Sequence, residues 1–174
     1  MSQRLLTPEA FLKRAENCPV FDARTPGEYV KAHIPGAYNL PLFSDEERHQ
    51  IGILYKAQGR EVAVLRGLEM VGPRLTDYIA RVKETTDSRE ILIHCWRGGM
   101  RSSSLAWLLD TAGYRVGLLQ GGYKAYRRQV QTTLAAPRPL LILSGMTGSG
   151  KTELLQMLAR RGEQVLDLEG LASH

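Results

Sequence analysis

A short apolar run at residues 91–93 leads into a turn with two adjacent glycines, after which apolar residues recur at helical spacing. An apolar run of this length, bounded by turn residues, is typical of a buried parallel strand. The helical spacing continues through Leu105, Leu108, Leu109 and Ala112. A turn that joins a buried strand directly to a helix is the repeating unit of α/β folds, so this segment strongly favours that class.

The rest of the chain alternates in the same way. Thr7 and Pro8 have the N-cap and first-turn positions of a helix, and Ser44 with Glu47 forms a capping box that begins another helix. The first predicted strand is Val20 with Phe21, and others follow at 38–40, 91–93 and 116–119. Helices are predicted over 45–55, 61–71 and 73–86, from residue 101 onward, and over 123–134. This alternation predicts a parallel sheet with helices on both faces.

Cys95 lies in the turn between the central strand and its helix, and it is the candidate catalytic residue. Unpaired amides and the helix dipole at a helix N-terminus stabilise an anion or a thiolate, and a reactive cysteine also needs to be accessible. The candidate anion-binding loop consists of Trp96, Arg97, Gly98, Gly99, Met100 and Arg101. A structural core cysteine is the alternative, but it does not explain two glycines and two arginines beside it.

Composition and charge limit the classes of function only broadly. A length of 174 residues with 43% hydrophobic content is enough for one full α/β core and part of a second. The net charge of +5 favours anionic partners without distinguishing RNA from small phosphates. Two cysteines, Cys18 and Cys95, without a signal-peptide pattern indicate a reducing cytoplasm, and we expect Cys18 to be structural. No apolar run approaches membrane-spanning length.

A second motif, G-M-T-G-S-G-K-T at residues 145–152, matches the phosphate-binding P-loop. It follows an apolar run at 140–143, which is predicted to be a strand, and precedes helical spacing through Leu154, Leu155 and Leu158. The amides of such a loop surround phosphates, a lysine neutralises them, and a threonine could ligand a magnesium ion. The candidate phosphate-binding residues are Gly145, Gly148, Ser149, Gly150, Lys151 and Thr152.

The two motifs divide the chain into a domain at residues 1–134, a linker at 135–139 with two prolines, and the start of a second domain at 140–174. A P-loop domain requires further strands, an acidic metal-binding residue and a lid. We therefore expect the chain to be a fragment whose P-loop part is incomplete and does not support full activity.

The motifs of the first domain resemble those of the rhodanese family of sulfurtransferases. The similar stretches are D-A-R-x-x-x-E-Y at residues 22–29, A-H-I-P-G-A-x-N at 32–39, and the strand that ends at Cys95. The resemblance covers about residues 5–134 and implies that Cys95 carries sulfur as a persulfide. Asp22, Arg24 and Glu28 could form one ion-pair cluster, which the resemblance implies to be largely structural.

The loop departs from the C-x-x-G-x-R-S pattern of many single-domain rhodaneses because it is one residue longer. His94, Cys95 and Arg101 also satisfy H-C-x5-R, the phosphate-binding loop of cysteine-dependent phosphatases. No carboxylate within the loop could protonate a leaving group, although the general acid could come from elsewhere. A phosphatase and a non-enzymatic RNA-binding module therefore stay open as alternatives.

Further stretches resemble the tRNA 2-selenouridine synthase family. They are N-L-P-L at residues 39–42, D-E-E-R at 45–48, Y-K-x-Q-G at 55–59, C-x-R-G-G-x-R-S at 95–102, G-G-Y-K-A at 121–125, G-x-T-G-S-G-K-T at 145–152 and D-L-E-G-L-A-x-H at 167–174. The resemblance implies a transferase that acts on the wobble 2-thiouridine of tRNA, with geranyl diphosphate and selenophosphate as substrates. It assigns Cys95 to the selenium step, implies tRNA and a selenophosphate-producing enzyme as partners, and leaves open whether the P-loop binds a prenyl diphosphate or a nucleotide with Mg²⁺.

Overall fold

The computed structural model describes residues 4–137 and 139–172. The chain forms two compact units, Met1–Ala135 and Ala136–His174, and each is described by itself. One linker residue, 138, and the last two residues of the D-L-E-G-L-A-x-H stretch, 173–174, lie outside the described residues.

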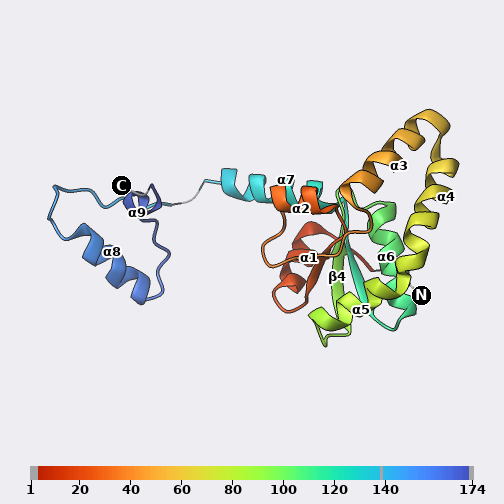
Figure 1. Cartoon of the computed structure of the whole chain (residues 1–174). Helices are drawn as coiled ribbons and strands as arrows, with labels where there is room; N and C mark the ends of the chain where they lie inside the picture. Colours follow the sequence, from red (N-terminus) through yellow and green to blue (C-terminus); the bar gives the residue numbers. More distant parts are fainter. Residues whose placement is uncertain (1–3, 138, 173–174) are drawn as a thin grey trace. The chain divides into compact units, whose positions relative to one another are not determined.

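The first unit is built on a five-stranded parallel sheet with the order β1-β5-β4-β2-β3 (Figure 1). Its strands are β1 (Arg4–Leu6), β2 (Val20–Asp22), β3 (Tyr38–Asn39), β4 (Glu90–His94) and β5 (Arg115–Leu119). The central strand β4 pairs with β2 through Phe21 and Ile93 and with β5 through Ile91 and Val116. The predicted parallel α/β class is therefore confirmed, and the strand before Cys95 is the middle of the sheet.

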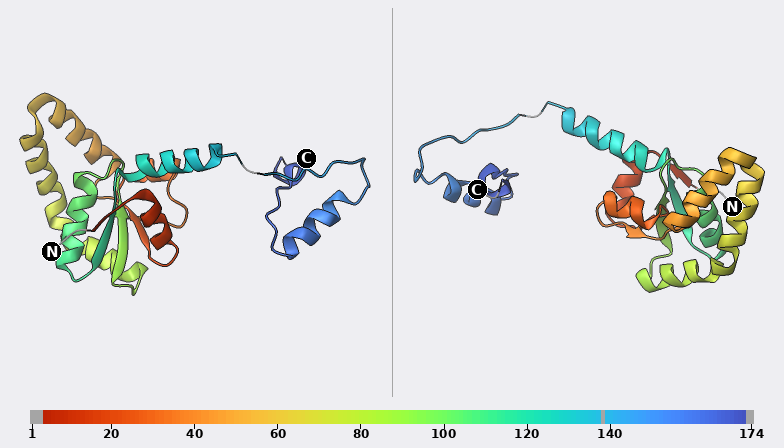
Figure 2. Two further views of the ribbon diagram at one scale, coloured as in Figure 1. Left: turned by 180° about the vertical axis from the view of Figure 1, so that it is seen from behind. Right: turned by 45° about the horizontal axis from the view of Figure 1, so that its top comes forward.

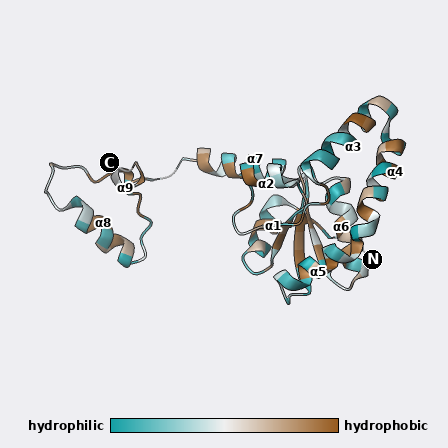
Figure 3. Cartoon of the chain, in the orientation of Figure 1, coloured by the Kyte–Doolittle hydropathy of each residue, from teal (hydrophilic) through white to brown (hydrophobic). Residues whose placement is uncertain are grey.

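Helices cover both faces of this sheet, as two further views show (Figure 2). They are α1 (Pro8–Ala15), α2 (Pro26–Lys31), α3 (Asp45–Gln58), α4 (Arg60–Val71), α5 (Leu75–Thr85), α6 (Met100–Thr111) and α7 (Gly122–Ala135), with a 3-10 turn η1 (Gly72–Arg74) before α5. Because side chains alternate along a strand, Ile91 and Ile93 pack with α5 and α6, whereas Leu92 packs with α1 and α7. The strands form the most hydrophobic part of the unit (Figure 3).

Local sequence signals account for the helix starts beside the sheet. At α3, the Ser44 hydroxyl accepts from the Glu47 amide at 3.1 Å, and the Glu47 carboxylate accepts from the Ser44 amide at 2.9 Å. This reciprocal arrangement is the predicted capping box, and Thr25 with Glu28 makes a second one at α2. Gly59, at φ +87°, then separates α3 from α4, which lie antiparallel as a hairpin beside α6.

Two strand predictions are wrong. Val20 and Phe21 do form a strand, but it is the second one. The first strand is β1, which pairs with β5, the last strand of the sheet along the sequence. A three-residue edge strand with exposed Arg4 and Leu5 carries too little periodicity to be recognised. Residues 140–143 form no strand, because a strand needs hydrogen-bonding partners and no described residue pairs with them; Leu141 is 89% exposed.

No helix among the described residues is long and apolar enough to cross a bilayer.

Candidate active site

Cys95 directly follows β4, so its sulfur lies at the carboxyl edge of the sheet where ligands of open α/β folds bind. The Gly99 amide donates to Sγ at 3.3 Å, and the Ser102 hydroxyl lies 3.2 Å from Sγ and 3.0 Å from the Gly99 carbonyl. A hydroxyl has a single proton, so Ser102 can donate either to the sulfur or to the carbonyl. With a thiolate, both the amide and the hydroxyl donate to the sulfur, which is the arrangement that stabilises negative charge.

The sulfur is less accessible than the sequence suggested. Cys95 is only 3% exposed and belongs to the core cluster on the α5 and α6 side of the sheet. The expectation of an accessible thiolate is therefore wrong for this conformation. The physical reason is the parity of the strand, which directs Cys95 to the same side as Ile91 and Ile93, beneath the loop that follows.

A turn after β5 supports the loop from behind. The Tyr123 amide donates to the Cys95 carbonyl at 2.8 Å, and the Lys124 amide donates to the Trp96 carbonyl at 3.0 Å. Gly122 has φ +61°, and a Cβ atom there would contact the Cys95 carbonyl oxygen and lie 2.5 Å from the Gly98 amide nitrogen. The chain thus needs glycine at this position both for its conformation and for the close approach of two backbones.

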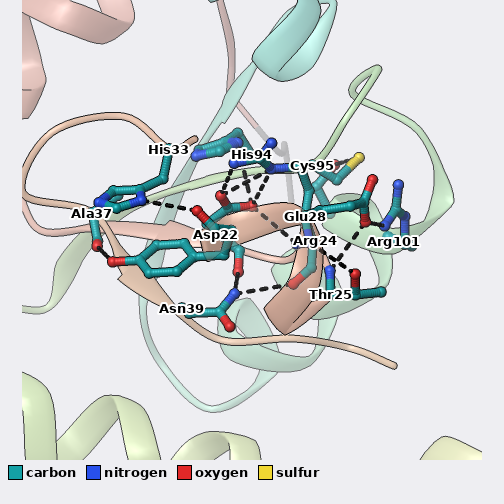
Figure 4. Close-up of polar contacts among 12 residues, drawn as sticks. Asp22, Arg24, Thr25, Glu28, His33, Ala37, Asn39, His94, Cys95 and Arg101 are labelled. Carbon is teal, nitrogen blue, oxygen red and sulfur yellow. Dashed lines mark hydrogen bonds and ion pairs between the residues drawn. The ribbon is translucent and has the colours of Figure 1, made fainter. Parts of the chain in front are cut away.

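The two loop arginines have different environments: Arg97 is exposed, whereas Arg101 is partly buried and forms an ion pair. Arg101 Nη1 donates to Glu28 Oε2 at 2.6 Å (Figure 4), and the same carboxylate oxygen accepts from the Thr25 amide at 3.1 Å. Burial opposes ionisation of Glu28, but the hydrogen bond and charge of Arg101 outweigh it and lower the Glu28 pKa. The anion-binding role of Arg101 stays a prediction, and in this structure its guanidinium is paired with a carboxylate.

The predicted cluster of Asp22, Arg24 and Glu28 is divided into two pairs. Arg24 bonds Asp22 through Nε at 2.9 Å and Nη2 at 2.6 Å, and both side chains are fully buried. Its Nη2 also donates to the Ala32 carbonyl at 2.7 Å, and its guanidinium carbon lies 3.8 Å from the centre of the Tyr123 ring. Glu28 pairs with Arg101 instead, so the expectation of a single cluster is wrong: capping α2 turns Glu28 toward the cysteine loop.

His94 is buried on the opposite side of the sheet from Cys95. Its ring stacks on Tyr123 at 6.0 Å between centroids, and Nδ1 lies 3.7 Å from Asp22 Oδ1. Burial lowers the pKa of His94 from 6.5 to about 4; the Asp22 carboxylate partly opposes the shift and Arg24 adds to it. A neutral imidazole therefore fills the core behind the loop near neutral pH.

Sequence reasoning missed several residues of this site. Ser102, Gly122 and Tyr123 contact the cysteine or its loop, yet sequence reasoning named them only within quoted motifs and gave them no role in the site. The G-G-Y-K stretch was a usable signal, because paired glycines directly after a central strand often mark a close backbone approach.

In the second unit, the P-loop motif precedes α8 (Lys151–Arg160), and a short helix α9 (Leu168–Leu171) follows. Gly148 and Gly150 both have φ +80°, and Lys151 Nζ donates to the carbonyls of Gly145 and Met146, each at 2.8 Å. The loop conformation thus depends on glycine, and its lysine bonds the loop's own carbonyls. Phosphate binding by this loop and magnesium binding by Thr152 stay predictions.

The parallel sheet and the strand-end cysteine loop define a rhodanese-like domain, and residues 7–129 match the family model "Rhodanese-like domain". Residues 138–174 match a second model, "tRNA 2-selenouridine synthase AAA domain". With this order of segments, and with its curated relatives, the chain belongs to the tRNA 2-selenouridine synthase family.

Three similar proteins illustrate the assignment. The tRNA 2-selenouridine synthase of Chromohalobacter salexigens is 39% identical over 184 residues, which cover 100% of this chain and 47% of the relative. That of Bdellovibrio bacteriovorus is 42% identical, covering 91% and 43%. The crystal structure of the N-terminal domain of a putative ATP/GTP binding protein from Clostridium difficile 630 has a TM-score of 0.66 and 40% identity, covering 72% of this chain and 98% of that one. The chain thus spans about half the length of the curated relatives it matches.

Proposed function

We propose that this chain provides the selenium-transfer part of an enzyme that converts wobble 2-thiouridine in tRNA to 2-selenouridine. In the proposed sequence, geranyl diphosphate first alkylates the thio group of the nucleoside. Selenium from selenophosphate then replaces the S-geranyl group, with Cys95 acting in this second step. The names of the relatives support the substrate class, and the substrates and partners of the whole enzyme are part of the proposal.

The observation that carries the proposal is the setting of Cys95. Its sulfur has two hydrogen-bond donors, Gly99 and Ser102, at the carboxyl end of the central strand. These donors hold the sulfur in place within the loop, and the loop amides that precede α6 are suited to a tetrahedral anion such as selenophosphate. A sulfur carrier has the same needs, so persulfide transfer from thiosulfate is the second candidate, favoured by the rhodanese-like fold itself.

Substitution of Cys95 by serine in the complete enzyme tests the proposal. Serine keeps the size of the side chain but is a poor nucleophile near neutral pH, so 2-selenouridine should be lost from cellular tRNA. Cys18→Ser is the matched control, because Cys18 is half-buried outside the loop and should leave the modification intact. Nucleoside mass spectrometry measures the result, and normal 2-selenouridine in the Cys95→Ser strain would remove this residue from the mechanism. Loss of thiosulfate sulfurtransferase activity with unchanged 2-selenouridine would favour the second candidate.

A further inference from the structure

A cavity of about 710 Å³ lies between the α3–α4 hairpin and the start of α6. Its apolar walls include Phe43, Ile51, Ala63, Val64, Leu68 and Val71. The volume falls in the range of roughly 300–1,000 Å³ that is typical of sites for small organic ligands. The hairpin that forms one wall projects beside α6 in the views of Figures 1 and 2. The first unit therefore contains an apolar site large enough for a hydrocarbon chain of several carbons.

The charged residues of this cavity all have one sign. Its lining includes Arg48, Lys56 and Arg60 from the hairpin and Arg97 and Arg101 from the cysteine loop. No aspartate or glutamate is among the described lining residues. Arg101 is already paired with Glu28, but the other four cationic side chains give the apolar wall an excess of positive charge. Such a wall complements a ligand that joins a hydrocarbon chain to an anionic group.

The cavity also borders the cysteine loop directly. Arg97, Met100 and Arg101 line it, and Gly99 within the same loop donates to the Cys95 sulfur. A ligand in the cavity would therefore lie against the loop on which the selenium chemistry is proposed to occur. In that chemistry, the C2–S bond of the nucleoside breaks, a C2–Se bond forms and geranylthiol leaves with a proton; water then releases phosphate from selenium. The hydrocarbon chain of the leaving group needs an apolar site beside the loop.

We propose that this cavity binds the geranyl chain of the S-geranylated tRNA nucleotide, and that the cationic side chains contact its phosphate. The proposal rests on the proposed function, because that function supplies the geranylated intermediate. Among ligands of this chemistry, the nucleotide is favoured over geranyl diphosphate because Arg97, Met100 and Arg101 of the loop that carries Cys95 line the cavity. The hairpin then acts as a specificity element for the intermediate of the selenium step.

Binding of small probes to the 174-residue chain tests this assignment without any selenium reaction. Isothermal titration calorimetry would compare S-geranyl-2-thiouridine 5′-monophosphate with 2-thiouridine 5′-monophosphate and with geranyl diphosphate. We expect the geranylated nucleotide to bind at least about tenfold more tightly than the unmodified one, because even a single methylene in an apolar pocket changes affinity by about that factor.

A pair of double variants makes the test specific for the cavity. Ile53→Gln with Leu68→Gln changes two lining residues that are more than half exposed, so the fold should tolerate both. Val62→Gln with Leu65→Gln changes two exposed apolar residues of α4 that do not line the cavity. The first variant should lose the preference for the geranylated nucleotide, and the second should keep it within about twofold. Circular dichroism would confirm that both variants are folded.

Three results would overturn the proposal. Equal affinity for the two nucleotides would show that the protein does not recognise the geranyl group. A preference for the geranylated nucleotide that survives in the Ile53→Gln, Leu68→Gln variant would place the geranyl-binding site outside this cavity. Tighter binding of geranyl diphosphate, lost in the lining variant, would assign the cavity to the donor instead. None of these binding results depends on Cys95. If the geranyl group did not bind in the cavity but the Cys95→Ser strain lacked 2-selenouridine as expected, the proposed function would still stand.

Discussion

At the scale of single residues, alternate side chains of β4 and of Cys95, which follows it, point to opposite faces of the sheet. Cys95 and Ile93 face the α5 and α6 side, and their neighbours Leu92 and His94 face away from it. The Cys95 sulfur thus has hydrogen-bond donors from Gly99 and Ser102, while the neutral His94 ring and the buried pair of Asp22 and Arg24 pack on the other side of the strand. The buried pair shows why a charged motif at a strand end can be structural: it fixes the backbone from which the loop departs.

His94 should make the stability of the first unit depend on pH in the mildly acidic range. In the unfolded chain the imidazole titrates near its ordinary pKa of 6.5, whereas burial lowers the pKa to about 4 in the folded state. Between these values the unfolded state binds the extra proton, so the free energy of unfolding should fall as pH falls. The slope is at most about 1.4 kcal/mol per pH unit.

Urea unfolding followed by circular dichroism, from about pH 7 to about pH 5, measures this slope for the wild type and for His94→Leu. Leucine has a similar volume and does not titrate, and the carboxylates that lie away from His94 contribute equally in both proteins. The wild type should lose more stability on acidification than the variant. Parallel pH profiles would show that His94 does not contribute.

At the scale of secondary-structure elements, two capping boxes provide a matched pair. Glu28 caps α2 and bonds Arg101 of the cysteine loop, whereas Glu47 caps α3 and bonds Arg74 at 3.0 Å. The pKa of each carboxyl is lowered: burial opposes ionisation of both, but hydrogen bonds to the capping amide and to the arginine outweigh it. The two glutamates therefore have the same local role, and only one of them touches the site.

We expect Glu28→Gln and Glu47→Gln to lose similar stability, about 1 kcal/mol each, because each weakens a cap and an ion pair. Only Glu28→Gln should change anion binding, and it should strengthen selenophosphate binding severalfold by removing a carboxylate that competes for Arg101. Calorimetric titration of both variants with selenophosphate is the measurement. Equal affinities in the two variants would mean that Arg101 does not bind the anion.

The turn between β5 and α7 should be sensitive to a single added methyl group. Gly122→Ala combines the cost of φ +61° with the contact against the Cys95 carbonyl and the Gly98 amide. Gly113→Ala is the control, because Gly113 has φ +90° and a Cβ atom there would meet nothing within 4 Å. The control should lose about 1 kcal/mol of stability for the conformation alone.

Gly122→Ala should lose at least about 1 kcal/mol more than the control and should also reduce selenium transfer, because the cysteine loop must move away. Urea unfolding and initial rates of 2-selenouridine formation by the complete enzyme measure the two effects. Equal losses of stability and equal rates in the two alanine variants would mean that the close contact of Gly122 with the cysteine loop does not affect stability or selenium transfer.

At the scale of the whole molecule, the sequence was most informative where the determinants are local. The apolar run at 91–93 and the capping box at Ser44 were located correctly because their signals lie within a few residues. Pairings between distant residues were not predictable: Glu28 and Arg101 are far apart along the chain, and β1 exists because β5 offers it an edge. The apolar run at 140–143 shows the converse, since a strand-like pattern forms no strand without a partner among the described residues.

In the proposed function, the cysteine loop and the P-loop motif act in different steps, so the nucleoside that accumulates in tRNA should show which of the two has failed. Lys151 now bonds two carbonyls of its own loop, and its ammonium would have to neutralise a bound diphosphate instead. In the complete enzyme, Lys151→Ala should therefore slow geranylation and leave 2-thiouridine in tRNA. Cys95→Ser should leave S-geranyl-2-thiouridine, because alkylation uses the nucleophilic sulfur of the nucleoside and needs no protein thiol. Mass spectrometry of tRNA nucleosides from the two strains distinguishes these products. If geranylation proceeded at the normal rate in the Lys151→Ala enzyme, the P-loop would have no role in binding the prenyl donor.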